Sequence, residues 1–168
     1  MKIFLTGTPH CGKSTLISKI VDKTRDKIGF ITHEIPDNAG GRFGFELSDM
    51  SDNKAILAHV ESKSPIRVSK YGVNIREFDS FIKPLFDIAP RKLLYIDEIG
   101  QMELYSDDFI KLVRLYLDSD NNFIGTLSSI FDHELIEEIK SNPNHVIYEI
   151  TVNNRDQLIS ELSKKLEL

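Results

Sequence analysis

The sequence has few of the features that mark membrane, secreted or nucleic-acid-binding proteins. Its single cysteine, Cys11, excludes an internal disulfide and fits the reducing conditions of the cytoplasm. There is no run of about 18 apolar residues, which a membrane-spanning helix needs, and no signal peptide is recognisable. The formal net charge of −5 provides no basic footprint for nucleic acid. We therefore expect a cytoplasmic protein that binds neither a membrane nor, judged by its overall charge, a nucleic acid.

Repeats, low-complexity tracts and long linkers are also absent. The 168 residues are enough for one domain with a sizeable core. Hydrophobic residues make up 40% of the chain and charged residues 28%, as in ordinary globular proteins. We expect residues 1–168 to form a single domain, and we expect the protein to be a monomer.

A phosphate-binding loop is the clearest feature that is present. The apolar stretch Lys2 to Thr6 predicts a strand that is buried on both faces of a parallel sheet. Residues 7–14, GTPHCGKS, match the pattern G-x-x-x-x-G-K-[ST] at every fixed position. A helix is predicted from Thr15 to about Arg25. The order of strand, glycine loop and helix is the context that this motif requires.

Each residue type in this loop suits contact with a triphosphate. Gly7 and Gly12 lack a Cβ, so backbone N–H groups can wrap the phosphates, and the helix N-terminus adds its dipole. Lys13 would place its charge between the β- and γ-phosphates, and the Ser14 hydroxyl would bind Mg²⁺. The residues expected to contact the nucleotide are Gly7, Thr8, Pro9, His10, Cys11, Gly12, Lys13, Ser14 and Thr15.

The rest of the chain alternates between strand and helix patterns. Strands are predicted at 28–35, 42–49, 54–60, 71–75, 92–97, 122–129 and 145–152. Helices are predicted at 76–88 with a kink at Pro84, from Ser106 as N-cap to about 117, at 132–140, and after Asn154 as N-cap. The alternation predicts an α/β fold of three layers with a mainly parallel central sheet, into which residues 36–75 insert an antiparallel hairpin.

Two local expectations concern the second and third strands. Gly29, together with residues 26–27, is expected to mark the turn that precedes the second strand. Phe43, Phe45 and Leu47 occupy alternate positions of the third strand, so they are expected to share its core-facing side.

A second group of candidate residues follows the apolar stretch 93–96. Asp97 and Glu98 end this strand, and ligands of open α/β sheets bind beyond the carboxyl ends of the strands. Asp97 would hold Mg²⁺, directly or through a water. Glu98 would orient an attacking water near the γ-phosphate. Acidic residues after strands often only cap a turn. The metal and water roles of this pair are therefore favoured only because the chain also contains the phosphate loop.

Five stretches of the sequence resemble one known family. The stretch DEIGQMEL at 97–104 is rather specific to that family. Supporting stretches are GFITHE at 29–34, GRFGF at 41–45, KYGV at 70–73 and TVNNRD at 151–156. They keep the same order from residue 1 to about 160. The sequence therefore resembles the THEP-type nucleoside-triphosphatases, whose human members are called cancer-related nucleoside-triphosphatases.

This resemblance implies a fold and an activity. The fold is a small RecA-like P-loop domain, and the activity is hydrolysis of ATP, GTP and other nucleoside triphosphates to the diphosphate and phosphate. The resemblance also implies a need for Mg²⁺, slow turnover and tolerance of several bases. Residues Gly7 to Thr15 would bind the phosphates, while Asp97 and Glu98 would carry the metal and water roles.

His10 departs from the family pattern, which usually has glycine at this place in the loop. If the position needs a left-handed backbone, a side chain there costs about 1–3 kcal/mol. His10 would then either weaken phosphate binding or offer its ring to a phosphate or a partner. Cys11 is either a small tolerated side chain or, at a helix N-terminus, an acidified thiol.

Two basic residues have both a functional and an ordinary interpretation. Arg42, flanked by glycines, could swing over the γ-phosphate, and we count it with Lys13 and Glu98 as a catalytic candidate. It could equally be a plain surface arginine. Lys70 has the same two interpretations.

Four further residues are weighed in the same way. Thr126 and Ser128 end a strand beside the phosphate-loop strand, where a hydroxyl could sense the γ-phosphate or simply be satisfied within the sheet. Arg155 begins the last helix and could stack on the nucleotide base. Glu103 could simply cap the next helix without any functional role.

Three classes of function remain open from the sequence. The first is a Mg²⁺-dependent nucleoside-triphosphatase with water as the acceptor. The second is a P-loop kinase that transfers the γ-phosphoryl group to a small molecule, a nucleotide or a nucleic-acid end, because the same loop, metal and carboxylate serve both reactions. The third is a nucleotide-gated switch in which hydrolysis resets binding to a partner.

Overall fold

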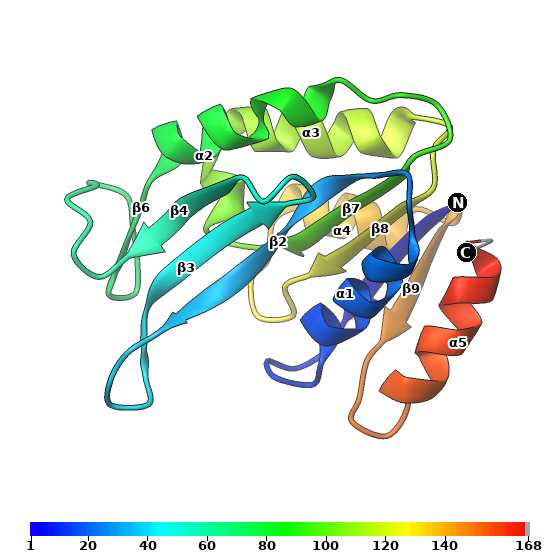
Figure 1. Ribbon diagram of the computed structural model, residues 1–168, viewed down its shortest axis with the longest axis horizontal. Coiled ribbons are helices and arrows are strands. Elements are labelled where there is room, and N and C mark those ends of the chain that lie inside the picture. The colour runs from blue at the N-terminus through cyan, green and yellow to red at the C-terminus, as the bar shows by residue number, and fades with distance from the viewer. Residues whose placement is uncertain (167–168) are drawn as a thin grey trace.

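The computed structural model describes residues 1–166 and contains one mixed β-sheet with helices on both faces (Figure 1). The elements are β1 (Lys2–Thr6), α1 (Lys13–Lys23), β2 (Lys27–Pro36), β3 (Arg42–Asp49), β4 (Lys54–His59), β5 (Arg67–Val68), β6 (Tyr71–Val73), α2 (Ile75–Ile82), β7 (Leu93–Ile99), α3 (Asp107–Asp118), β8 (Phe123–Leu127), α4 (Glu134–Ser141), β9 (His145–Glu149) and α5 (Arg155–Lys165). Short 3₁₀ turns at Lys83–Phe86 and Glu103–Tyr105 follow α2 and β7.

The sheet has a parallel part and an antiparallel part. Its strand order is β5-β6-β4-β3-β2-β7-β8-β1-β9. Strands β2, β7, β8, β1 and β9 run parallel, whereas β3, β4, β6 and β5 continue the sheet from β2 in antiparallel pairs. The predicted α/β fold is confirmed. Residues 36–75 contain more than the single predicted hairpin, because β5 and β6 form a second hairpin beyond β4.

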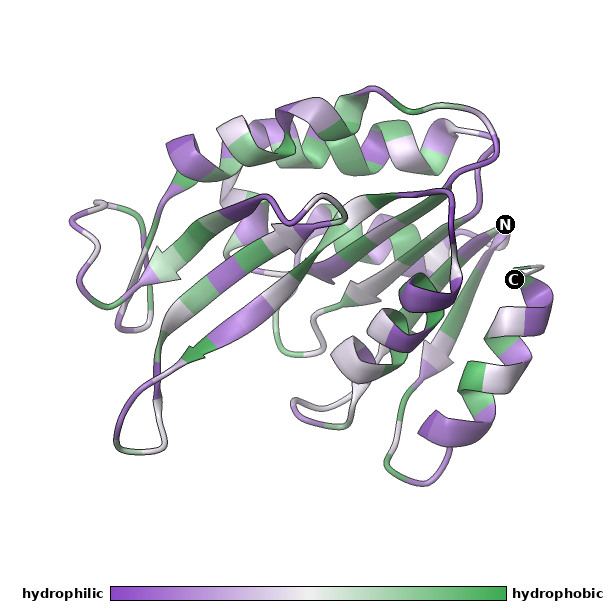
Figure 2. Ribbon diagram, in the orientation of Figure 1, coloured by the Kyte–Doolittle hydropathy of each residue, from purple (hydrophilic) through white to green (hydrophobic). Residues whose placement is uncertain are grey.

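Two helical layers cover the sheet. Helices α1 and α5 lie on one face, and α2, α3 and α4 lie on the other (Figure 1). Alternate residues of β1 serve the two layers: Ile3 and Leu5 pack with α1 and α5, while Phe4 packs into the opposite core, edge-to-face on Phe123 at 5.3 Å between ring centroids. Figure 2 shows the apolar residues gathered on the central strands. Burying each such side chain stabilises the fold by about 1.5–3 kcal/mol.

Gly29 lies inside β2, so the prediction that it marks a turn is wrong. Its φ is +150°, and a Cβ at this position would lie 1.7 Å from the carbonyl oxygen of Tyr95 in β7. Glycine is therefore needed here because β2 and β7 approach each other closely.

Phe43 is another wrong expectation, since 38% of it is exposed, whereas Leu47 is buried and Phe45 is partly buried. Phe43 lies on a part of β3 that extends past the last pairing of β2 with β7, and its ring stacks on His59 at 6.0 Å. No core layer faces it there.

Several predicted boundaries shift. Helix α1 begins at Lys13 rather than Thr15. The helix predicted at 76–88 is α2 followed by a 3₁₀ turn, and the break coincides with Pro84, which lacks an N–H to continue the helix. Strand β9 ends at Glu149 and not at residue 152.

Asn154 precedes α5, but its side chain does not cap that helix as predicted. Its Oδ1 accepts a hydrogen bond from the Thr151 N–H at 2.9 Å, and its Nδ2 donates to the Glu149 carbonyl at 2.9 Å. The side chain is thus used to close the loop between β9 and α5, beside the phosphate-binding loop.

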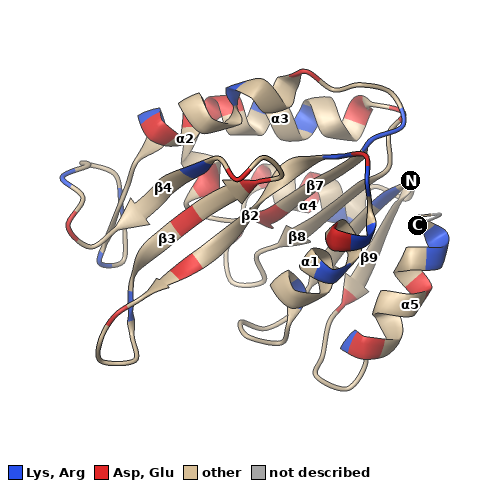
Figure 3. Cartoon of the chain, viewed as in Figure 1, with Lys and Arg blue, Asp and Glu red and all other residues tan. Residues whose placement is uncertain are grey.

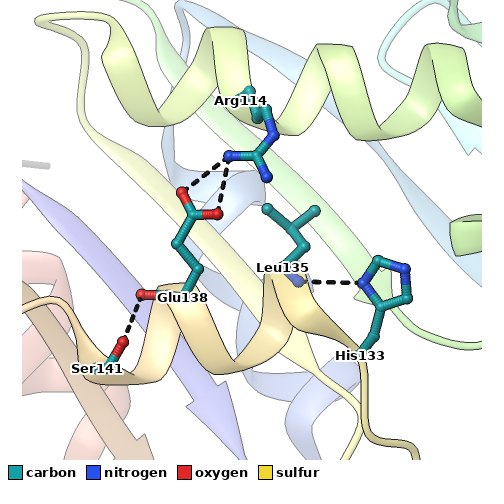
Figure 4. Close-up of polar contacts among 5 residues, drawn as sticks. All are labelled: Arg114, His133, Leu135, Glu138 and Ser141. Carbon is teal, nitrogen blue, oxygen red and sulfur yellow. Dashed lines mark hydrogen bonds and ion pairs between the residues drawn. The ribbon is translucent and has the colours of Figure 1, made fainter.

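Helix α4 starts at Glu134, two residues later than predicted, and is capped by a histidine (Figure 4). His133 Nδ1 accepts a hydrogen bond from the Leu135 N–H at 3.1 Å. Arg114 of α3 donates from one nitrogen to both carboxylate oxygens of Glu138, each at 2.8 Å. These contacts hold α4 against α3 and thereby position the loop that leaves β8.

Lysine and arginine residues are interspersed with aspartate and glutamate along the strands, helices and loops (Figure 3). Among residues 1–166, no helix is long and apolar enough to cross a membrane. Of the parallel strands, β1, β7, β8 and β9 are followed by loops at one edge of the sheet, and these loops build the candidate site there.

Candidate active site

The phosphate-binding loop, residues 7–14, joins the end of β1 to the start of α1. Gly7 has φ +142°, and a Cβ on it would lie 2.5 Å from the carbonyl oxygen of Ile150. Gly12 precedes α1 with φ +104°. His10 has φ +64°, in the left-handed region where we anticipated a cost for any residue except glycine. The backbone of the loop therefore bears out the concern about His10.

Lys13 is buried although it carries a charge. Its Nζ donates hydrogen bonds to the carbonyl oxygens of Gly7 at 2.9 Å and Thr8 at 3.2 Å. The ammonium group thus lies inside the loop, where it is within reach of any anion that the loop binds.

Asp97 is 2% exposed and lies inside β7, which continues to Ile99, two residues past the predicted strand end. Its Oδ1 accepts a hydrogen bond from the Thr126 hydroxyl of β8, whereas its Oδ2 is buried without any hydrogen-bond partner. Burial raises the pKa of Asp97, and the hydroxyls of Thr126 and Ser14 and the charge of Lys13 oppose that rise. A buried carboxylate oxygen without a partner is costly unless a cation binds it.

The chemistry of this corner fits a magnesium ion. Two oxygen donors are available here: the hydroxyl of Ser14, in the first turn of α1, and the free Oδ2 of Asp97, in β7. The described residues contain no cluster of three or more His, Cys, Asp or Glu side chains arranged for a metal. Magnesium suits such a sparse donor set, since it takes one or two carboxylates and completes its shell with waters and phosphate oxygens.

Glu98 is half-buried and follows Asp97 through a cis peptide bond. Burial and the neighbouring charge of Asp97 raise the pKa of Glu98, and Lys13 opposes the rise. Its side chain bends back over Gly100, where a Cβ would lie 2.6 Å from Glu98 Oε1 and 3.1 Å from Oε2 of Glu103. Burial and the charge of Glu98 raise the pKa of Glu103 well above its usual value.

A cleft of about 690 Å³ contains these groups. The phosphate loop and the ends of β7 and β8 line one part of it. The β2–β3 hairpin, one residue each of β4 and β5, the turn after β7 and the loop that leaves β8 line the rest. The lining residues used below are Lys13, Ser14, Asp97, Glu98, Glu103, Glu34, Arg42, Phe45, Val68 and Phe131.

Arg42 lines the same cleft as the phosphate loop, so the structure brings these distant residues together. Its Nη1 forms an ion pair with Glu34 Oε1 at 2.7 Å, and its guanidinium lies 5.6 Å from the ring centroid of Phe45. Both partners of the ion pair are nearly half exposed, so the pair contributes about 0–1 kcal/mol and can open readily.

Arg155 lies against the other side of the loop. A Cβ on Gly12 would be 2.5 Å from its Cδ, so the arginine stem crosses the loop at this glycine. A second cavity, of about 390 Å³, lies nearby between residues 8–11 of the loop and residues 149–153.

Other candidates occupy different places. Ser128 and Thr15 line the cleft. The Thr126 hydroxyl is engaged with Asp97 and is therefore the ordinary kind of satisfied strand hydroxyl that we allowed for. Lys70 is not among the cleft residues, and its Nζ lies 5.4 Å from the ring centroid of Tyr71.

Sequence reasoning missed two acidic residues of the cleft. Glu34 was noted only as part of a family stretch, and its pairing with Arg42 depends on the register of β2 and β3. Glu103 was considered only as a cap of the next helix, and the structure confirms Ser106, the predicted N-cap, in that role, because its Oγ accepts from the Phe109 N–H at 2.9 Å. The contact between Glu34 and Arg42 could have been sought from the alternation of side chains along β2 and β3.

Comparison with known proteins gives a consistent result. Residues 2–163 match the model of a protein family described as NTPase. Nucleoside-triphosphatase THEP1 of Thermotoga petrophila is 37% identical over 164 residues, which cover 96% of this chain and 90% of that protein. Nucleoside-triphosphatase THEP1 of Aquifex aeolicus is 36% identical over 177 residues, with 99% of both chains covered.

Two solved structures share the fold across nearly the whole chain. The crystal structure of THEP1 from Aquifex aeolicus has a TM-score of 0.90 at 36% identity and covers 100% of both chains. The solution structure of a human cancer-related nucleoside triphosphatase has a TM-score of 0.81 at 29% identity and covers 98% of this chain and 96% of that one. The chain therefore belongs to the THEP1 family of nucleoside-triphosphatases.

Proposed function

We propose that this protein hydrolyses several nucleoside triphosphates, ATP and GTP among them, to the diphosphate and phosphate in a Mg²⁺-dependent reaction. The observation that carries the proposal is the partnerless Oδ2 of the buried Asp97, which lies beside Ser14 at the mouth of the phosphate loop. A cation site next to a polyphosphate site is the arrangement that phosphoryl transfer needs.

The loop holds the phosphates through its backbone N–H groups and through the N-terminus of α1. Lys13 exchanges the two carbonyl oxygens it now contacts for the more strongly negative oxygens of the β- and γ-phosphates. Ser14 and Asp97 hold the magnesium ion, which neutralises charge on the phosphate oxygens when it is bound.

Glu98 is the residue that orients the attacking water. Its carboxylate lies in the same cleft, one residue beyond Asp97, and accepts a hydrogen bond from the water. Arg42 supplies a positive charge to the γ-phosphate after it leaves Glu34. Because the ion pair with Glu34 is weak and exposed, breaking it costs little free energy.

The protein should accept nucleotides with different bases because the loop contacts the phosphates and not the base. The loop grips phosphates, which all nucleoside triphosphates share. Arg155 crosses the loop at Gly12, and its guanidinium is the group that stacks on the base, a contact that any of the bases can make.

The test is phosphate release from ATP, GTP, CTP and UTP, measured with Mg²⁺ and with excess chelator and in the absence of any acceptor. We expect steady turnover on several bases with Mg²⁺ and none with chelator. Tight nucleotide binding without phosphate release would contradict hydrolysis as the activity.

Transfer to another acceptor is the second candidate. The cleft continues past Glu98 to the aromatic and aliphatic residues Phe45, Val68 and Phe131, so it has room for more than the γ-phosphate and a water. If phosphate release fails although nucleotide binds tightly, the search should turn to phosphoryl transfer onto a small hydroxylated molecule.

A further inference from the structure

Thr126 is a fully buried threonine of β8 to which the proposed reaction assigns no role. It is 0% exposed and pairs with Leu5 of β1. Its Oγ1 donates a hydrogen bond to Oδ1 of Asp97 on the neighbouring strand β7. Burying a hydroxyl group costs free energy unless it has a partner, and here the partner is the carboxylate that we propose as a magnesium ligand.

The pairing of β7 with β8 is irregular at this place. The register shifts between Ile96 and Ile99, so two residues of β7 lie opposite the single residue Thr126 of β8. Such a β-bulge interrupts the backbone ladder and re-aims a side chain, and bulges recur beside active sites. Asp97 is the first of the two bulged residues, and its carbonyl oxygen accepts a hydrogen bond from the Thr32 hydroxyl of β2 at 2.6 Å. Hydroxyl groups from both neighbouring strands therefore hold Asp97 where its pairing with β8 is interrupted.

The two carboxylate oxygens of Asp97 have different surroundings. Oδ1 accepts the hydrogen bond from Thr126, whereas Oδ2 is buried without a hydrogen-bond partner. The terminal torsion of an aspartate side chain is broad, so a directed contact is needed to decide which oxygen faces which way. A hydrogen bond to a charged oxygen is stronger than one between neutral groups, so the Thr126 hydroxyl can fix this torsion.

We infer that Thr126 is a positioning residue, whose hydroxyl holds Oδ1 of Asp97 and thereby leaves Oδ2 free for the magnesium ion. The inference rests on the proposed role of Asp97 as a magnesium ligand. Thr126 is fully buried and is not among the residues that line the cleft, so it acts through Asp97 and not on the metal. Removing a group that orients a metal ligand weakens metal affinity by about 10- to 100-fold.

The test measures binding of a fluorescent, non-hydrolysable ATP analogue, so it needs no turnover. The quantity compared is the gain in affinity caused by Mg²⁺, which is the dissociation constant in excess chelator divided by that in excess Mg²⁺. Valine keeps the branched shape but lacks the hydroxyl, so Thr126→Val should reduce this gain about 10- to 100-fold while affinity in chelator stays within about twofold of wild type. Serine keeps the hydroxyl, so Thr126→Ser should retain the gain within about threefold.

A control variant and a double-mutant cycle separate positioning from general damage. Thr24→Val removes a hydroxyl that bonds to the Ile20 carbonyl at 3.1 Å, outside the cleft, and should leave the gain unchanged. In the Asp97→Ala background the carboxylate to be positioned is gone, so Thr126→Val should cause no further reduction. A purely structural role of Thr126 would weaken binding equally in chelator and in Mg²⁺.

Three results overturn the inference: an unchanged gain in Thr126→Val, an equal loss of affinity in chelator and in Mg²⁺, or a Thr126→Ser variant as impaired as Thr126→Val. If Thr126→Val does not fold, Thr126→Cys, which has a weaker donor of similar size, takes its place and the same outcomes decide. Failure of the proposed function is recognised separately. If Asp97→Ala alone keeps the wild-type gain, the magnesium role of Asp97 fails, and the role of Thr126 fails with it.

Discussion

Lys13 is held by two backbone carbonyls of its own loop, so replacing it should affect the nucleotide more than the fold. Lys13→Ala removes the charge that faces the β- and γ-phosphates, and nucleoside triphosphate affinity should fall at least about 100-fold. The measurement is a binding titration with Mg²⁺ present. Lys19→Ala, exposed on the same helix, is the matched control. Full turnover by Lys13→Ala would refute the site.

Glu98 should matter for turnover and not for binding. Glu98→Gln keeps the shape of the side chain but cannot accept the proton of the water, so kcat should fall by about 10²–10⁴ while nucleotide affinity stays within a few-fold. Steady-state phosphate release and a separate binding titration distinguish the two quantities. Loss of binding would instead assign Glu98 to the metal or to the fold.

Gly100 offers a way to move Glu98 without changing its chemistry. In Gly100→Ala the new methyl group would collide with Glu98 Oε1, so the carboxylate must shift. We expect kcat to fall about 10-fold or more with unchanged affinity, because misplacement of a catalytic group costs rate. Gly12→Ala is the contrasting variant: its methyl meets Arg155 and its φ is +104°, so it should weaken binding. Equal loss of affinity in both variants would contradict this division.

At the level of single residues, the sequence predicted the groups that follow an apolar strand or sit in a fixed motif. Lys13, Ser14, Asp97 and Glu98 all lie in the cleft, and their roles remain proposals. Glu103 escaped prediction because it is five positions after Glu98, a spacing without meaning in either a helix or a strand. A bend at the 3₁₀ turn brings the two acids together, and that bend is set by tertiary packing.

Among the elements, α3 depends on its N-cap. Ser106 is fully buried, accepts from the Phe109 N–H at 2.9 Å and donates to Asp79 of α2, so one hydroxyl joins two helices. Ser106→Ala should lower the free energy of unfolding by about 1–3 kcal/mol, measured by urea denaturation. Ser80→Ala, whose exposed hydroxyl bonds within α2, should change it by less than about 0.5 kcal/mol. Equal effects would show that the link between the helices is unimportant.

The parallel strands were predictable and the antiparallel extension only partly so. Long apolar runs such as 93–96 define buried strands by themselves. Strand β5 has two residues, Arg67–Val68, and follows Pro65 in a polar stretch, so no periodicity could reveal it. It exists because β6 offers a free edge, with Arg67 paired to Gly72. Pairing partners supply the information that local patterns lack.

At the scale of the whole molecule, Glu103 links stability to pH. Its pKa is raised well above the usual 4.5, so the folded protein binds this proton more tightly than the unfolded chain does. The resulting stabilisation is complete below that value and is lost as the pH rises through the folded-state pKa. Glu103→Gln cannot ionise and escapes this loss.

Between pH 4 and pH 8 the wild type should therefore lose stability relative to Glu103→Gln, so the unfolding free energy of the variant minus that of wild type should increase with pH. Each unit by which the pKa is raised corresponds to about 1.4 kcal/mol. Urea denaturation at several pH values measures the difference, in which the raised pKa values of Asp97 and Glu98 largely cancel. A difference that stays constant with pH would contradict a raised pKa.

The sheet order carries a consequence for synthesis on the ribosome. Strand β1 is made first, yet its neighbours in the sheet are β8 and β9, which end at residues 127 and 149. The nascent chain must therefore carry an unpaired apolar strand, and the loop attached to it, through most of translation. Gly7 of that loop packs against Ile150, so the loop gains its support from both neighbouring strands only after β9 has been made.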